Sequence, residues 1–173
     1  GVVVQPIDKA QLEGIAAQLA KEKVEAVAVS FLNAYLNDAH EAQAVQFLRA
    51  RLPGVYVVAG TELSREWYEY ERTATAAANA YAGPRLSDCI TRLDARMRGE
   101  GLARTFYMMA SNGGVVALQR ARHQPCAMLE SGPVGGSIGA GAYARALGLS
   151  KVIAFDMGGT TAKCAIVQDG QFE

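Results

Sequence analysis

The segment that most constrains the fold of this chain is a short polar bend between two apolar stretches near the C-terminus. Residues 152–155 read Val-Ile-Ala-Phe, residues 156–161 read Asp-Met-Gly-Gly-Thr-Thr, and residues 164–167 read Cys-Ala-Ile-Val. Apolar runs on either side of a glycine pair predict a tight β-hairpin. The chemistry of this bend is therefore the first indication of what the chain binds.

The residues of the bend suit contact with phosphate. Gly158 and Gly159 let the backbone approach an anion closely, with their N–H groups pointing into the turn. Thr160 and Thr161 add hydroxyl donors, whereas Asp156 is itself negative, so its natural partner is a cation such as Mg²⁺ or the water shell of that ion. These features favour a nucleotide-handling protein. Because most glycine-containing hairpins bind nothing, this loop alone leaves a plain turn equally open.

The composition is that of a globular domain. Of the 173 residues, 50% are hydrophobic, and 17 Lys and Arg balance 17 Asp and Glu, which suits a sizeable core. Zero net charge without a basic run argues against nucleic-acid binding. No apolar stretch reaches membrane-spanning length and no signal peptide is visible, so we expect no membrane partner.

The cysteines and histidines indicate no metal centre. Cys89, Cys126 and Cys164 are odd in number and lack the spacing of metal ligands. We therefore expect free thiols in a reducing cytosol, and hence a cytoplasmic protein. His40 and His123 lie far apart in the sequence, and we interpret both as surface residues rather than ligands.

The first part of the chain predicts strands that alternate with helices. Apolar runs at residues 1–5 and 24–32 predict two strands, with a helix capped by Asp8 between them. That βαβ order favours parallel pairing. A helix over residues 38–52 and a strand over 55–59 continue the pattern.

A long helical region is predicted next. Ser64 is expected to cap it, and we interpret the polar-aromatic cluster at residues 68–72 as an exposed face with ion pairs, an interface or substrate role being the alternative. Pro84 either kinks the helix or starts a new one. An apolar stripe at helical spacing, typical of core, consists of Leu86, Ile90, Leu93 and Met97.

Two further glycine-rich segments each admit two interpretations. Residues 111–114, Ser-Asn-Gly-Gly, follow a strand predicted over 105–110, and they form either a hairpin turn or a loop that faces a ligand. Residues 131–136, Ser-Gly-Pro-Val-Gly-Gly, begin a helix in which Pro133 suits the first turn. Its glycines cost helix stability, so either this helix packs tightly on a sheet or its N-terminus presents bare N–H groups to an anion. These two interpretations are compatible.

The organisation along the chain predicts an α/β fold, with a mixed sheet and flanking helices. Residues 1–130 form an α/β region before the phosphate loop, and residues 131–173 begin a second lobe that carries the hairpin and is truncated. Asp169-Gly170 is a hairpin signal that requires a third strand, yet the sequence ends at Glu173. We therefore expect the chain to be a fragment of a longer protein.

Six stretches together resemble the hydantoinase A / 5-oxoprolinase / acetone carboxylase family of the actin-like ATPase superfamily. They occur in order across nearly the whole chain, so their combination is far more specific than any one of them. The stretches are Tyr35-Leu36-Asn37-Asp38-Ala39-His40-Glu41, Glu69-Tyr70-Glu71-Arg72, Asn79-Ala80-Tyr81, Ser111-Asn112-Gly113-Gly114, Ser131-Gly132-Pro133-Val134-Gly135-Gly136 and Asp156-Met157-Gly158-Gly159-Thr160-Thr161.

The resemblance implies a partial actin-like, ribonuclease H-like fold, with ATP and Mg²⁺ as cofactors. Family members use ATP to open a cyclic amide such as hydantoin or 5-oxoproline, or to activate a ketone for carboxylation. The implied cofactor-binding residues are Asp156, which would also hold the metal, Gly158, Gly159, Thr160, Thr161 and Lys163 in the hairpin, and Ser131, Gly132, Gly135 and Gly136 at the helix start. The sequence identifies no nucleophile or general base.

Lys163 departs from the family pattern, because many members carry an acidic residue there. Strand alternation places Lys163 on the same side as Thr161, where a cation either reaches a phosphate or points to solvent. The departure bears on the identity of the substrate more than on the fold.

Three functions follow from the sequence. The first is an ATP-dependent hydrolase of a cyclic amide, and the alternatives are a subunit of an ATP-dependent ketone carboxylase and a non-catalytic interaction fragment. The expected partners are a small cyclic amide or ketone and either a second subunit or further copies in a homo-oligomer. We expect the isolated chain to be inactive, because an actin-like cleft needs two lobes and this chain carries at most one.

Overall fold

The computed structural model describes residues 2–172, which divide into two compact units. The first unit runs to Leu102 and also takes Arg122–Cys126, and the second takes Ala103–Ala121 and the residues from Ala127 onward. Helices flank small sheets in both units, which confirms the predicted α/β class. Among the described residues, no helix is both long and apolar enough to cross a membrane.

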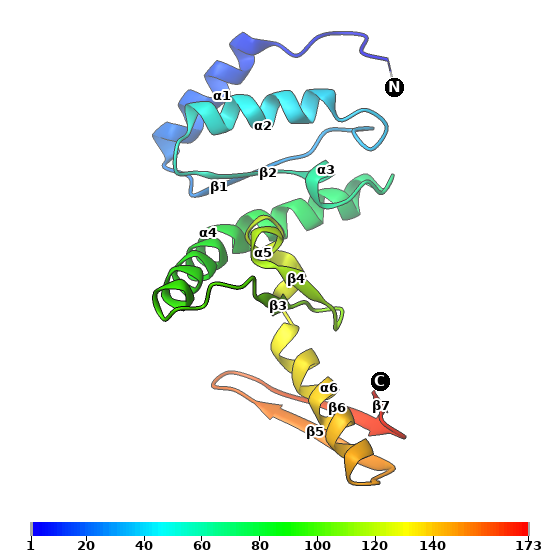
Figure 1. The fold of residues 1–173 in the computed structure, drawn as a ribbon. Helices are drawn as coiled ribbons and strands as arrows, with labels where there is room; N and C mark the ends of the chain where they lie inside the picture. The colour runs from blue at the N-terminus through cyan, green and yellow to red at the C-terminus, as the bar shows by residue number, and fades with distance from the viewer. Residues whose placement is uncertain (1, 173) are drawn as a thin grey trace. The chain divides into compact units, whose positions relative to one another are not determined.

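The first unit is a two-stranded parallel sheet between helices. β1 and β2 pair in register from Ala26 opposite Tyr56 to Val29 opposite Ala59, with α2 as the crossover. α1 and α2 lie on one side of this sheet and α4 on the other (Figure 1). The elements are α1 (Lys9–Glu22), β1 (Ala26–Val29), α2 (Ala39–Arg51), β2 (Tyr56–Ala59), α3 (Gly60–Leu63) and α4 (Glu69–Gly99).

The predicted parallel pairing is confirmed, but its strands are β1 and β2. The strand predicted over residues 1–5 is wrong: Gly1 lies outside the described residues, and residues 2–5 form no strand. Val2, Val3 and Val4 are exposed, because no neighbouring strand accepts their backbone groups. Asp8 does cap α1, as predicted, and accepts hydrogen bonds from the amides of Ala10 and Gln11 at 2.8 and 3.2 Å.

The core of the first unit forms where α1 and α2 cover the sheet. Apolar side chains from these helices meet those of β1 and β2, and burying them supplies the main favourable term in folding. The buried cluster comprises Leu12, Ala16, Val29, Ala44, Val45, Leu48, Leu52, Val57 and Ala59.

A buried polar cluster lies just beyond the carboxyl ends of β1 and β2. The Glu41 carboxylate is 0% exposed, and it accepts hydrogen bonds from the Phe31 amide at 2.9 Å and from the Thr61 amide and hydroxyl at 2.9 and 2.5 Å. Arg72 donates to the Phe31 carbonyl at 2.7 Å and pairs with Glu69. The interpretation of residues 68–72 as an exposed face is therefore wrong for Arg72, whose side chain is fully buried.

Two expectations about the long helix are also corrected. Ser64 does not cap α4, which begins at Glu69; it ends the short helix α3 and accepts a hydrogen bond from the Glu66 amide at 3.2 Å. α4 continues through Pro84, so the alternative in which Pro84 starts a new helix is wrong. In the predicted apolar stripe, Ile90 is buried, whereas Leu93 is 37% exposed.

The returning segment Arg122–Cys126 is attached to the first unit by Tyr56 and Asn79. The Tyr56 hydroxyl donates to the carbonyls of Arg122 and His123 at 3.1 and 3.0 Å. The Asn79 amide group donates to the His123 carbonyl at 3.0 Å and accepts from the Cys126 amide at 3.2 Å. Asn79 is 0% exposed, so its polar atoms need these partners.

The second unit contains two antiparallel sheets and one long helix. Its elements are β3 (Tyr107–Met109), β4 (Val115–Ala117), α5 (Leu118–His123, shared with the first unit), a 3-10 helix (Pro125–Met128, also shared), α6 (Ser131–Ala146), β5 (Lys151–Met157), β6 (Ala162–Gln168) and β7 (Gln171–Phe172). β5, β6 and β7 form one sheet in that order, and α6 lies along one of its faces (Figure 1).

The turns of the second unit follow their sequence signals. Residues 111–114 form the hairpin turn between β3 and β4, and the Ala110 amide donates to the Gly114 carbonyl at 2.8 Å. Asp169 and Gly170 have φ of 51° and 77°, the left-handed pair that a two-residue hairpin turn requires. The predicted third strand is thus present as β7.

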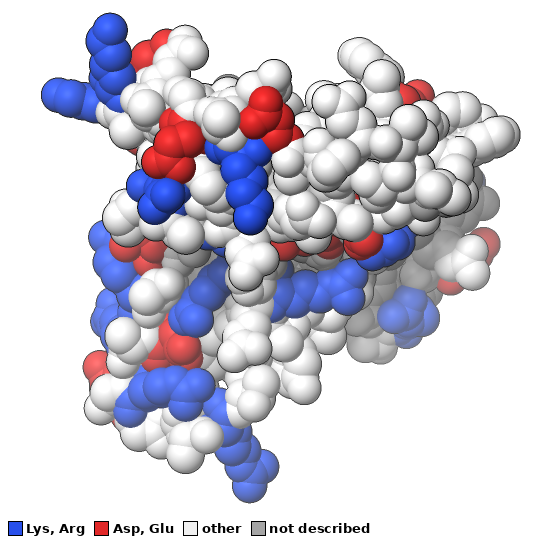
Figure 2. Space-filling model, turned by 90° about the horizontal axis from the view of Figure 1, so that it is seen from above, with Lys and Arg blue, Asp and Glu red and all other residues white. Residues whose placement is uncertain are grey.

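Charges of both signs share the surface. In Figure 2, Lys and Arg side chains are interspersed with Asp and Glu on the face shown. Several of them form exposed ion pairs along helices, such as Arg92–Asp88 at 3.1 Å. Cys89, Cys126 and Cys164 form no disulfide with one another, as predicted.

We predict that Gly83→Ala destabilises the protein by about 1–3 kcal/mol, because the added methyl group overlaps the Tyr56 ring. That ring is held by the hydrogen bonds of its hydroxyl and cannot move away freely. Gly14→Ala on α1 is the matched control: its methyl group meets open space, so the change should stabilise by about 0.5–1 kcal/mol. Urea unfolding of both variants gives the comparison.

We also predict that stability falls above about pH 10 in a way that depends on Tyr56. Burial raises the pKa of Tyr56 above its ordinary value of 10.0, although the hydrogen bond from Asn79 opposes this. Because the pKa of Tyr56 is higher in the folded than in the unfolded state, its contribution to the unfolding free energy is fully present below the unfolded-state pKa. That contribution is lost as the pH rises through the folded-state pKa. Unfolding free energies at about pH 9 and about pH 11 should differ less in Tyr56→Phe than in the wild type. Tyr143→Phe, on a side chain that is 74% exposed, should leave the difference unchanged.

Candidate functional site

The predicted phosphate bend lies at the surface of the second unit. β5 and β6 pair from Lys151 opposite Gln168 to Met157 opposite Ala162, so the hairpin is confirmed. Every residue from Asp156 to Thr161 is exposed. The bend is therefore open to solvent, which a phosphate-binding turn requires.

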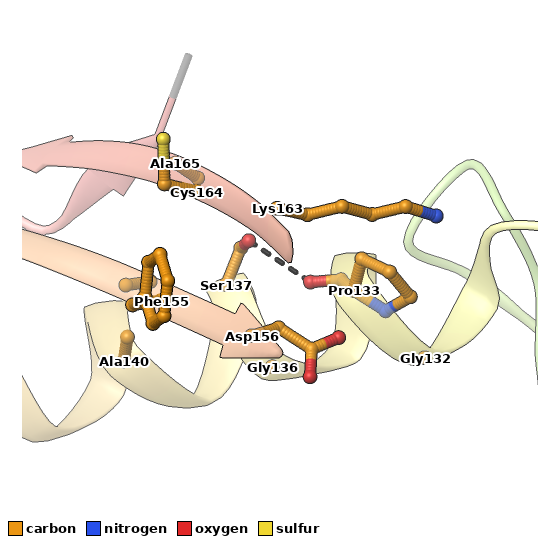
Figure 3. A pocket seen from close by; sticks show the side chains of 11 residues that line it. Gly132, Pro133, Gly136, Ser137, Ala140, Phe155, Asp156, Lys163, Cys164 and Ala165 are labelled. Carbon is orange, nitrogen blue, oxygen red and sulfur yellow. Dashed lines mark hydrogen bonds between the residues drawn. The ribbon is translucent and has the colours of Figure 1, made fainter. Parts of the chain in front are cut away.

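A cavity of about 440 Å³ lies between the start of α6 and the bend-proximal ends of β5 and β6 (Figure 3). Of the predicted cofactor residues, Gly132, Gly136, Asp156 and Lys163 line it. The other predicted residues do not, namely Ser131, Gly135, Gly158, Gly159, Thr160 and Thr161. The start of α6 and two charged hairpin residues, Asp156 and Lys163, thus share one concave site. The glycine-threonine turn at residues 158–161 is not part of its lining.

Helical spacing explains which residues of α6 reach the cavity. Gly132, Gly136 and Ala140 follow one another at intervals of four, so they share one helix face. Pro133 and Ser137 line the adjacent row, and the Ser137 hydroxyl donates to the Pro133 carbonyl at 2.9 Å. Ser137 and Ala140 were not predicted as site residues. Their spacing of four residues from Pro133 and Gly136 is the sequence signal that identifies them.

The close packing of α6 that was considered from the sequence is confirmed, whereas anion binding at its N-terminus stays a prediction. A side chain at Gly141 would approach the Gly170 carbonyl oxygen to 3.1 Å, so there the helix packs closely on the β6–β7 turn. A side chain at Gly135 would instead contact Met109 of β3. Gly132 and Gly136 have no atom within 4 Å of an added Cβ, and they leave the cavity open.

The start of α6 carries no side-chain cap. Glu130 occupies the N-cap position without capping the helix, and its carboxylate pairs instead with the Lys163 ammonium. Lys163 stands opposite Asp156 across the hairpin, and both side chains point toward the start of α6 in Figure 3. The positive end of the helix macrodipole thus adjoins one ammonium and two carboxylates.

The amides of the bend are not equally available. The Gly158 amide donates to the Thr161 carbonyl at 3.0 Å and closes the turn. Gly159 has no atom within 4 Å of an added Cβ, so an anion can approach its backbone. The Gly158 amide is therefore already used, whereas the Gly159 amide and the hydroxyls of Thr160 and Thr161 are candidate donors to phosphate.

The donor set near the bend suits a hydrated Mg²⁺. Within residues 2–172 there is no group of three or more His, Cys, Asp or Glu side chains that would hold a metal ion alone. Mg²⁺ keeps several waters and is commonly bound through one or two carboxylates together with phosphate oxygens. The exposed Asp156 carboxylate at the mouth of the cavity fits that mode, in which the nucleotide supplies the remaining ligands.

Comparison with protein families agrees with this geometry. Residues 72–173 match the Hydantoinase/oxoprolinase family, and residues 1–52 match the Hydantoinase/oxoprolinase N-terminal region. The chain belongs to the hydantoinase/oxoprolinase family. This membership confirms the resemblance carried by the six sequence stretches.

Individual relatives of this family member extend well beyond the chain. It is 36% identical over 167 residues to an uncharacterized protein of Methanocaldococcus jannaschii, covering 96% of the chain and 25% of that protein. It is 32% identical over 171 residues to caprolactamase subunit alpha of Pseudomonas jessenii, covering 99% of the chain and 25% of the subunit. The chain therefore spans about a quarter of the length of the curated relatives it matches.

Solved structures share the fold. The crystal structure of the ATP-dependent caprolactamase from Pseudomonas jessenii superposes with a TM-score of 0.76, covering 96% of this chain and 24% of that one. Nucleotide-free acetone carboxylase, described as acting in ATP-dependent acetone carboxylation, gives a TM-score of 0.84 at 23% identity, covering 97% and 24%. The second likeness establishes the fold alone. The predicted partial actin-like α/β fold is thus that of ATP-dependent enzymes.

We predict that the Glu130–Lys163 ion pair contributes little to folding. The two side chains are 59% and 39% exposed, and an exposed pair is worth about 0–1 kcal/mol because water screens it. Glu130→Gln, Lys163→Gln and the double variant form a double-mutant cycle, measured by urea unfolding. A coupling energy well above about 1 kcal/mol would show that the pair is a structural element of the unit rather than part of a binding site.

Proposed function

We propose that this chain supplies one phosphate-binding lobe of an ATP-dependent enzyme that opens a cyclic amide of the hydantoin or 5-oxoproline type. The observation that carries the proposal is the cavity in which Asp156 and Lys163 of the hairpin meet the uncapped start of α6. Membership of the hydantoinase/oxoprolinase family supports it. So does the 32% identity to a caprolactamase subunit, since caprolactam is a cyclic amide.

The chemical difficulty of such a reaction is that an amide carbonyl is a poor electrophile. ATP with Mg²⁺ would supply the phosphoryl group that activates the amide oxygen, so that attack by water breaks the C–N bond and opens the ring, and hydrolysis of the resulting acyl phosphate releases inorganic phosphate. Catalysis of phosphoryl transfer is largely positioning and charge neutralisation. The residues of this chain therefore need to hold phosphate and metal in place rather than to form covalent bonds.

Each site residue has a role that fits its position. The Asp156 carboxylate would bind the metal or its water shell at the mouth of the cavity. The Gly159 amide and the hydroxyls of Thr160 and Thr161 would donate to phosphate oxygens from the bend. The start of α6, where Gly132 leaves the backbone accessible, would present its positive end to the same anion.

Lys163 is the cation nearest the site, and Glu130 holds its ammonium beside the start of α6. Since an ammonium carries three donors, Lys163 would bind a phosphate oxygen while it keeps Glu130 as a second partner. This role makes the departure from the acidic family pattern favourable for nucleotide affinity, because it replaces repulsion of phosphate with attraction.

A second candidate is a subunit of an ATP-dependent ketone carboxylase. The 29% identity to the acetophenone carboxylase gamma subunit of Aromatoleum aromaticum favours it, because the same lobe would activate a ketone oxygen. Turnover of the full-length protein that requires bicarbonate would favour the carboxylase, and bicarbonate-independent opening of a cyclic amide would favour the hydrolase. A chain that neither binds nor hydrolyses ATP in any assembly would instead be a non-catalytic interaction fragment.

A partner subunit is part of the proposal. The caprolactamase relative is named as an alpha subunit, which implies at least one other kind of chain in that enzyme. We propose that this protein likewise acts with a second subunit or as a homo-oligomer, and that its substrate is a small cyclic amide or ketone.

We predict that Asp156→Ala in the full-length protein abolishes ATP-dependent turnover, with a loss of at least about 100-fold, because the metal loses its protein ligand. The fold should remain intact, since Asp156 is exposed. Turnover and Mg²⁺ dependence are measured together with the melting temperature.

Asp88→Ala is the matched control, because it removes an exposed carboxylate from α4 in the other unit. It should leave turnover and Mg²⁺ dependence unchanged. Wild-type rates from Asp156→Ala would remove Asp156 from the metal site and with it the main support for the proposed chemistry.

A further inference from the structure

The first unit contains a second polar cavity that the proposed function does not use. It has a volume of about 330 Å³ and lies between α2, β2, α4 and the returning segment Arg122–Cys126. Its polar lining consists of Arg49, Tyr56, Glu62, Ser87, Arg122 and His123. The lining carries two guanidinium groups and one carboxylate, and a second carboxylate, that of Asp94, pairs with Arg122 from outside the lining.

Arg122 is the residue that points most clearly to a missing ligand. Its Nη2 donates to the Asp94 carboxylate at 3.0 Å, and its side chain is 28% exposed. Its Nε is buried and has no hydrogen-bond partner within the described part of the chain. A buried unpartnered donor on a charged group costs free energy unless an unseen water or ion satisfies it.

Arg49 brings a second cation to the same cavity. Its Nε and Nη2 donate to the Val57 carbonyl at 3.2 and 2.8 Å, and Nη2 also pairs with Glu62 at 3.0 Å. These contacts hold the guanidinium in place on the backbone of β2. A planar guanidinium with remaining N–H donors is well suited to bind a carboxylate or phosphate.

Further hydrogen bonds hold the residues of the lining in position. The hydrogen bonds from Tyr56 and Asn79 to the carbonyls of Arg122 and His123 attach the returning segment to α4 and β2. Asp94, which pairs with Arg122, is itself held by Arg98 at 2.9 Å. The donors are therefore already fixed in the free protein, so binding of a ligand costs little free energy for ordering them.

We propose that this cavity binds a small oxyanion, a phosphate or a carboxylate, between Arg49 and Arg122. The anion would accept a hydrogen bond from the orphaned Arg122 Nε and bind the N–H donors of the two guanidinium groups that their carboxylate partners leave unused. The cavity is many times larger than the roughly 30 Å³ that one water occupies in the liquid, so it admits such an ion. This site lies in the first unit and does not depend on the proposed ATP chemistry of the second.

The test titrates the protein with inorganic phosphate, and separately with succinate, against chloride at equal ionic strength. Arginine Nε–H resonances are followed by NMR, because they report on the orphaned donor directly. We expect the Arg122 Nε–H signal to shift saturably with phosphate or succinate, and not with chloride. A response to phosphate alone or to succinate alone assigns the ligand class.

Matched variants separate binding at this cavity from general salt effects. Arg122→Lys keeps the charge but removes the Nε donor, and it should weaken the anion affinity at least about tenfold, followed through the Tyr56 amide signal. Arg96→Lys makes the same change on an exposed position of α4 and should leave the affinity unchanged.

A second variant keeps the proposal testable if Arg122→Lys does not fold. Ser87→Leu places a bulky side chain at the wall of the cavity without removing a charge, and it should abolish the saturable shift. No saturable shift in the wild type would mean that the cavity holds water only and would overturn the proposal. So would an unchanged affinity in a folded Ser87→Leu variant.

Discussion

The close packing of α6 on the β5–β6–β7 sheet is the contact on which the candidate site depends. Small residues make this approach possible: at Gly141 the helix comes so near the Gly170 carbonyl that an added Cβ would lie 3.1 Å from it. Glycine has a different effect nearer the start of α6, where Gly132 and Gly136 leave the cavity open. A helix that contacts the sheet at its C-terminal half and leaves a gap at its N-terminal half forms a cavity at its positive end.

In the first unit, three polar residues of the family stretches are buried and have structural contacts. Glu41, Arg72 and Asn79 belong to three of the stretches, and each is at most 1% exposed. Glu41 joins the loops that follow β1 and β2, and Asn79 attaches the returning segment to α4. Buried polar groups are costly without partners, so the hydrogen bonds of Glu41 and Asn79 favour one arrangement of the loops. The polar motifs of this half therefore help to fix the fold, whereas those of the second unit line or adjoin the candidate site.

The hairpins and helices were predictable because their signals are local. The glycine pair at residues 158–159 and the Asp169-Gly170 turn each dictate a bend, and Asp8 caps its helix through neighbouring amides. The strand predicted at residues 1–5 failed because a strand needs a partner that the β-branched pattern cannot supply. Arg72 was misassigned for a related reason: its burial is set by a backbone carbonyl of Phe31, 41 positions away, and no local pattern encodes that contact.

The candidate site was predictable as a motif but only in part as a cavity. The sequence placed phosphate contacts on both glycines of the bend, whereas the Gly158 amide is used to close the turn. Nothing in the sequence indicated that Lys163 pairs with Glu130, because the two residues are 33 positions apart. The resulting balance of charge is informative. Asp156 and Glu130 would repel a polyphosphate, and Lys163 with the end of α6 offsets only part of that repulsion. A divalent cation at Asp156 would reverse the sign of this balance, so under the proposed function nucleotide binding at this cavity would depend on metal binding at Asp156.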